Sequence, residues 1–198
     1  MEMTKFFNEF TFLGYDIRRV KETHFCTEKV LKKVFSIDQA ISERLDNYID
    51  DRNKKNNEFQ MIPGLYPSYQ KAKNDFEKIK TNDSKNSIEI IALFIYKESF
   101  NTAVKMGYLE DESAIAIDKC VISHISKCEG YDVATLEYEW ISFLTNCGKC
   151  VECYVNSISI NDVYLIKSLE KAKELKVKAD GEIPEHSPFG IWSIWSTV

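Results

Sequence analysis

Residues 88–106 read Ile-Glu-Ile-Ile-Ala-Leu-Phe-Ile-Tyr-Lys-Glu-Ser-Phe-Asn-Thr-Ala-Val-Lys-Met, a stretch with an unusually high share of apolar side chains. On a helical projection these side chains fall on nearly all sides, which is typical of a helix at the centre of a protein. Gly107 follows at a position where helices often end. The stretch therefore predicts a central helix against which other helices pack.

Five further segments show apolar residues at steps of three and four, the spacing of a helix with one buried face. The first covers residues 28–50, and the second starts at Pro67 and buries Tyr69, Ala72, Phe76 and Ile79. The third covers residues 112–128 and is ended by Gly130. The last two are capped by Asp132 and by Asn161 or Asp162. Only 7 glycines and 4 prolines occur, which disfavours an all-β sandwich or barrel. We expect an all-α fold, an antiparallel bundle or stacked hairpins of roughly six or seven helices.

The 198 residues fit a single domain that covers residues 1–198. Residues 1–22 form an aromatic N-terminal segment, and residues 178–198 are expected to be an irregular aromatic tail docked on the core. Residues 68–73 resemble residues 168–173, but one pair of similar segments does not predict a solenoid. The chain shows no signal peptide, and its longest apolar run is far below the ~20 residues of a membrane span. These features predict a cytoplasmic protein with no membrane partner.

A cluster of three cysteines, Cys147, Cys150 and Cys153, has three possible interpretations. A metal site would combine it with Cys120, His124 and Cys128, which share one face of the predicted helix 112–128. A redox role would use Cys147 and Cys150 as a dithiol, although such pairs usually follow a strand. The third interpretation is simple core packing, because cysteine also behaves as a small apolar residue. We favour packing and expect neither a metal nor a cofactor.

Charge is distributed unevenly along the chain. The net charge is −5 overall, and residues 106–162 alone hold three lysines and ten acids. Such a surface repels phosphates, so nucleic acid is not an expected partner. It would attract a basic protein and speed encounter with it, and the alternative, which we favour for the surface by itself, is a solvated acidic face of the kind that many soluble proteins carry. The predicted partner-binding residues are Glu110, Asp111, Asp118, Glu129, Tyr131, Asp132, Glu137, Tyr138 and Glu139, and Trp140 is a further aromatic anchor if it is exposed.

Three familiar catalytic signatures are absent from the sequence: a glycine-rich phosphate loop, a Gly-x-Ser-x-Gly elbow and a His-Glu-x-x-His helix. We therefore expect a non-catalytic protein that binds another protein. The leading hypothesis is an immunity or inhibitor protein that neutralises a toxin, for example a nuclease, by covering its basic surface. The alternatives are a metal- or redox-responsive protein that uses the cysteines and a helical enzyme whose catalytic residues are distant in sequence.

Overall fold

The chain folds around a four-stranded antiparallel sheet, so the prediction of an all-α helical bundle is wrong. The computed structural model describes residues 3–20, 23–24, 30–31, 35, 65–82, 87–109, 118, 120–137, 140–146 and 158–198. The strands lie in the order β1 (Phe10–Val20), β4 (Ser87–Tyr96), β6 (Phe189–Thr197) and β5 (Ile125–Thr135). A second, two-stranded sheet pairs β2 (Thr23–His24) with β3 (Val30–Leu31).

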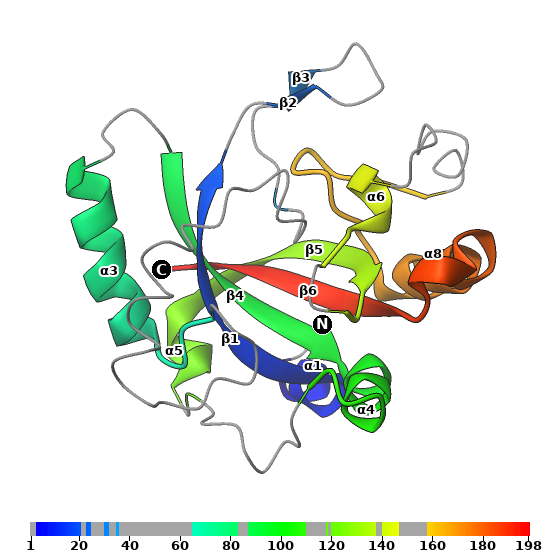
Figure 1. The fold of residues 1–198 in the computed structure, drawn as a ribbon. Coiled ribbons are helices and arrows are strands. Elements are labelled where there is room, and N and C mark those ends of the chain that lie inside the picture. The colour runs from blue at the N-terminus through cyan, green and yellow to red at the C-terminus, as the bar shows by residue number, and fades with distance from the viewer. Residues whose placement is uncertain are drawn as a thin grey trace.

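Helices surround the four-stranded sheet, and Figure 1 shows α3 and α8 on opposite flanks of it. The helices are α1 (Met3–Glu9), α3 (Tyr69–Asn82), α4 (Lys97–Lys105), α5 (Val121–His124), α6 (Phe143–Asn146), α8 (Leu169–Glu182) and the 3-10 helix η2 (Pro184–His186). Buried residues of α1, α3 and α8 pack in one apolar cluster and those of α4 pack in another. Within the described ranges, no helix combines the length and apolar character that crossing a membrane requires.

The apolar stretch 88–106 is a strand followed by a helix, not one central helix. Ile90, Ala92 and Phe94 of β4 belong to the first cluster, whereas Ile91, Leu93 and Ile95 belong to the second. Alternate residues of a strand point to opposite faces, so a strand covered on both faces has no polar side. Such a run is apolar in every direction, and its periodicity does not distinguish it from a buried helix.

The predicted aromatic tail is an inner strand of the sheet. β6 lies between β4 and β5 and pairs with both of them. Trp195 contributes to the first apolar cluster, and Trp192 and Ile194 contribute to the second. The strong apolar character of this segment therefore reflects burial on both faces of a strand, and the segment is regular rather than irregular.

Of the other predicted helices, the one that starts near Pro67 is confirmed as α3. The last helix begins later than predicted, at Leu169, and Ser168 caps it by accepting a hydrogen bond from the backbone of Lys171 at 3.2 Å. Asn161 and Asp162 instead precede this helix. Most of the predicted helix 28–50 lies outside the described residues, but Val30 and Leu31 within it form the strand β3.

The predicted helix 112–128 and the helix capped by Asp132 are also wrong. In the described part of residues 112–128 only Val121–His124 is helical, β5 begins at Ile125, and after Asp132 the next described helix is the short α6 (Phe143–Asn146). Asp132 lies inside β5, and Gly130, expected to end a helix, forms part of a bulge in this strand. Polar residues at the start of β5 interrupt the alternation of apolar and polar side chains that marks a strand. Val121, Ile125 and Cys128 are instead four and three residues apart, which is the spacing of a helix with one apolar face.

The chain is built from two similar units, residues 3–96 and residues 121–197. Each unit contains a helix that runs directly into a strand, then a longer helix, then a second strand antiparallel to the first. The sequence Gly14-Tyr15-Asp16-Ile17 in β1 corresponds to Gly130-Tyr131-Asp132-Val133 in β5. Residues 68–73 and 168–173, which resemble each other, lie at the starts of α3 and α8. Their similarity is therefore part of an internal duplication that the described elements of the two units share.

The same backbone detail recurs in both units. A bulge precedes Gly14 in β1 and Gly130 in β5, and these glycines have φ angles of 151° and 144°. The next residue in each strand forms a bridge to the segment before the long helix. Tyr15 exchanges backbone hydrogen bonds with Tyr66 at 2.8 and 2.7 Å, and Tyr131 does so with Ile166 at 2.9 and 2.8 Å.

Candidate functional site

Several predicted partner-binding residues lie in the interior. Asp132 is fully buried and Tyr131 is 6% exposed, both within β5. The side chain of Glu129 is 8% exposed and accepts hydrogen bonds from Ser196 and Lys127. Apolar clusters cover both faces of the sheet. The residues of β5 that we expected on the surface of a helix are therefore buried. These three residues do not offer a surface to a partner.

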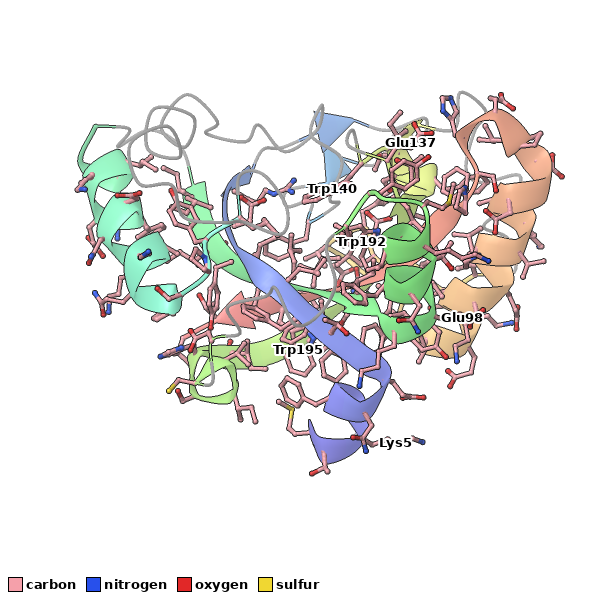
Figure 2. The ribbon with its side chains drawn as sticks, turned by 60° about the horizontal axis from the view of Figure 1, so that its bottom comes forward. Lys5, Glu98, Glu137, Trp140, Trp192 and Trp195 are labelled. Atoms are coloured by element: carbon pink, nitrogen blue, oxygen red, sulfur yellow. The ribbon has the colours of Figure 1, made fainter. Side chains whose placement is uncertain are left out.

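Trp140 is not a free aromatic anchor either, because its side chain is only 4% exposed. Its ring lies 5.0 Å from that of Trp192 in β6, centroid to centroid. Figure 2 shows the two tryptophans near each other above the sheet, with Trp195 farther down. Trp140 therefore holds the chain that follows β5 against the core.

Glu137 is exposed, and it lies on a turn that leaves the end of β5 (Figure 2). The turn is closed at its base, because the backbone N–H of Thr135 donates to the carbonyl of Ile141 at 3.1 Å. The N–H of Ile141 donates in return to Oγ1 of Thr135 at 3.0 Å. These bonds and the buried ring of Trp140 fix both ends of the turn. We call the described residues of this turn, Leu136, Glu137 and Trp140, the acidic turn, after the exposed carboxylate of Glu137.

The remaining predicted residues divide into two groups. Glu110, Asp111, Tyr138, Glu139, Cys147, Cys150 and Cys153 lie outside the described residues. Cys120, His124 and Cys128, the other half of the proposed metal site, do not share a helix face, because α5 ends at His124. Within the described part of the chain, no group of three or more His, Cys, Asp or Glu side chains is arranged to hold a metal ion.

Cys128 has an environment that suits packing. It is partly buried, and its Sγ lies 3.7 Å from Oγ of Ser193 in the neighbouring strand. Burial raises the pKa of this thiol, although the contact with Ser193 acts in the opposite direction. A raised pKa disfavours the thiolate, which is the form that binds metals and attacks disulfides.

A polar cluster joins residues from four parts of the chain around Asp118. Oδ2 of Asp118 accepts a hydrogen bond from the Tyr15 hydroxyl at 3.1 Å and lies 3.5 Å from Nδ1 of His124. The backbone N–H groups of Cys120 and Tyr69 donate to the two carboxylate oxygens, at 2.9 and 3.3 Å. The ring of Tyr69 stacks on that of His124 with 4.5 Å between centroids. Nδ1 of His124 also lies 3.4 Å from the Tyr15 hydroxyl.

Electrostatics in this cluster favour a charged carboxylate beside a neutral phenol. Burial by itself would raise the pKa of Asp118, but the hydrogen bonds from Cys120, Tyr69 and Tyr15 and the proximity of His124 lower it overall. Burial raises the pKa of Tyr15, and the neighbouring Asp118 raises it further. Tyr15 therefore remains a hydrogen-bond donor, and Asp118 remains an acceptor at neutral pH.

A shallow groove of about 320 Å³ lies next to this cluster. It runs between α3 and the ends of β4 and β6, and its lining residues are Tyr69, Lys73, Phe76, Glu77, Ile88, Glu89, Ile90, Ser196, Thr197 and Val198. Tyr69 belongs to both features, since its hydroxyl donates to the carbonyl of Val198 while its ring covers His124. The backbone N–H of Val198 in turn donates to the carbonyl of His124 at 2.9 Å.

Sequence patterns place Asp118 in the predicted partner surface and His124 in the possible metal site, and they do not mark Tyr15 or Tyr69 as functional. One signal was available, the recurrence of Gly-Tyr-Asp at residues 14–16 and 130–132. It would have revealed the duplication, but not that Tyr15 meets a carboxylate 103 residues away. In comparisons with known proteins, no family model, no curated protein and no solved structure matches the chain.

Proposed function

We propose that the protein binds a basic protein partner and blocks it, as an immunity or inhibitor protein neutralises a toxin such as a nuclease. The observation that carries the proposal is the exposed carboxylate of Glu137 on the acidic turn. The proposal no longer uses Glu129, Tyr131 or Asp132, which are buried. It therefore differs from the broad acidic face expected from the sequence and concerns a small, well-anchored contact surface.

Anchoring supports a binding role for the acidic turn. A loop that is ordered before it binds loses less conformational entropy on association than a mobile one. The Thr135–Ile141 hydrogen bonds hold the base of the turn, and the backbone N–H of Leu136 donates to the carbonyl of Pro188 at 3.2 Å. In the sequence, an aromatic residue, Tyr138, and a second acidic residue, Glu139, follow Glu137. This composition suits a partner with lysines or arginines around a binding site.

The first experiment is a pull-down from the native host at about 50 mM and about 500 mM salt, followed by purification of the retained partner. A partner held through charge dissociates at the higher salt, because salt screens contacts between exposed charges. Its affinity is then measured for the wild type and for Glu137→Lys. We expect the charge reversal to weaken binding by roughly tenfold, mainly through slower association.

Glu98→Lys is the matched control, since Glu98 is also exposed but lies on α4, away from Glu137 (Figure 2). Placing a lysine in the first turn of α4 costs less than about 1 kcal/mol, so this variant folds. It should bind the partner as the wild type does. The proposal is wrong if no basic partner is retained, or if both charge reversals weaken binding equally.

A further inference from the structure

The duplication places two tyrosines in equivalent positions, Tyr15 in β1 and Tyr131 in β5. Each follows the bulged glycine of its strand and bridges to the segment before the long helix of its unit. That long helix begins at Tyr69 in the first unit and at Leu169 in the second. The two sites can therefore be compared residue by residue on the same backbone.

Tyr15 contacts the end of the short helix of the other unit, and the end of the corresponding helix acts on Tyr131 through its charge. His124 is the last residue of α5, directly before β5, and its Nδ1 lies 3.4 Å from the hydroxyl of Tyr15. Glu9 is the last residue of α1, directly before β1, and its charge acts on Tyr131. Thus His124 and Glu9 occupy corresponding positions in the two sites.

The two sites differ in chemistry although their backbones correspond. The ring of Tyr131 lies 5.9 Å from that of Phe10, and its long helix begins with Leu169, although the charges of Glu170 and Glu9 also act on this tyrosine. Tyr15 instead contacts a carboxylate and an imidazole, and a second tyrosine replaces the leucine. Among the described residues, the second unit forms the same bridge and bulge with no carboxylate or imidazole hydrogen-bonded to the hydroxyl of Tyr131, so this backbone does not require such a bond. Partial burial of polar groups carries a desolvation cost, which suggests a role beyond folding.

We propose that Tyr15, Asp118 and His124 form a general-base site in which His124 accepts a proton from a hydroxyl group. Asp118, only 11% exposed, faces Nδ1 of the imidazole. A proton on Nδ1 would face this carboxylate, which would leave the lone pair of the imidazole on Nε2. The side chain of His124 is 27% exposed, which gives solvent partial access to it. This inference does not rest on partner binding or on the acidic turn.

The reaction class that fits is hydrolysis of a small acyl compound by water. Nε2 of His124 takes a proton from water as the water oxygen forms a bond to the acyl carbon. The bond from that carbon to the leaving group then breaks, and the leaving group departs with the electron pair. The proton on His124 passes to the leaving group or to solvent, which restores the base. In the groove next to the cluster, Phe76, Ile88 and Ile90 are the apolar residues that would contact the acyl chain, and Tyr69, which stacks on His124, is also part of the lining.

The test uses 4-nitrophenyl acetate as the probe and the full chain. The release of 4-nitrophenolate is measured for the wild type, for His124→Gln and for Asp118→Asn from pH 5 to pH 9. We expect His124→Gln to lose roughly tenfold in rate and to lose the ionisation seen in the pH profile of the wild type. Asp118→Asn should retain that ionisation with a lower rate, because the imidazole is present but poorly oriented. His186→Gln is the matched control, since His186 is also partly exposed but lies in η2.

Melting temperatures separate this role from a structural one. If the cluster only holds α5 and α3 together, His124→Gln lowers the melting temperature and leaves the rate per folded molecule unchanged. That result overturns the proposal. So does a His186→Gln variant that loses as much activity as His124→Gln, because the activity then belongs to exposed imidazoles in general. A loss of rate and of the ionisation confined to His124→Gln, in a folded protein, supports it.

Discussion

Leu93 and Ile194 face each other at the centre of the sheet, where β4 pairs with β6. On the outer sides, Leu93 is opposite Gly14 of β1 and Ile194 is opposite Gly130 of β5. Each of the two residues is thus the counterpart of the other in the duplicated units. This relationship indicates an approximate twofold axis between the two side chains. The central pair of strands therefore consists of β4 from the first unit and β6 from the second.

Because of this shared pair of strands, we predict that the two units unfold together. Ile91, Leu93 and Ile95 of the first unit pack in one cluster with Trp192 and Ile194 of the second. Opening either unit alone would expose this cluster to water. Urea unfolding followed by circular dichroism and by tryptophan fluorescence should give coincident curves. Two separate transitions would show instead that each unit is stable alone.

Gly14→Ala and Gly130→Ala should each destabilise the protein by about 1–3 kcal/mol. At Gly14 an added Cβ would lie 2.8 Å from Cβ of Leu65, and at Gly130 it would lie 2.8 Å from Cβ of Leu165. Both glycines also have positive φ angles that alanine rarely adopts. The free energy of unfolding from urea titration measures the effect. Gly181→Ala is the control, because nothing lies within 4 Å of its added Cβ, and it should leave stability unchanged or raise it.

Asp118 should contribute to stability at neutral pH but not in acid. Its pKa is lowered in the folded state, so its contribution is present above the unfolded value of about 3.9 and disappears as the pH falls through the folded value. Asp118→Asn should therefore be less stable than the wild type at pH 7, and the difference should shrink below about pH 4. Unfolding free energies at several pH values test this, with the exposed Asp162→Asn as control. A difference that stays constant down to pH 3 would contradict the assignment.

Ser142→Ala should cost about 1–3 kcal/mol of unfolding free energy. Ser142 and Asp132 are both fully buried, and Oγ of Ser142 donates to Oδ1 of Asp132 at 2.7 Å. The same oxygen accepts from the backbone N–H of Val133, and removing the serine weakens the solvation of a buried carboxylate. Ser159→Ala, at an exposed position, should change stability by less than about 0.5 kcal/mol. Equal effects of the two variants would mean that the Ser142–Asp132 bond contributes nothing.

The spacing of apolar residues along the chain was sufficient to predict a helix where that helix has one apolar and one polar side. The helix that buries Tyr69, Ala72 and Ile79 is α3, and these residues are buried while the lysines between them are not. The end of α4 was also predictable, since Gly107 adopts a φ of 76° just after the C-cap residue Met106. Both features depend on residues within a few positions of one another.

The sequence by itself determined where apolar segments lie and that Asp118 and His124 carry chemically useful side chains. The tertiary structure alone decided that residues 87–96 and 189–197 are strands, because burial on both faces removes the alternation that marks a strand. It also decided that Asp132 is enclosed and that Asp118 meets Tyr15. Hydrogen bonds between strands and between side chains join residues far apart in the chain, so their partners are set by packing and not by neighbouring residues.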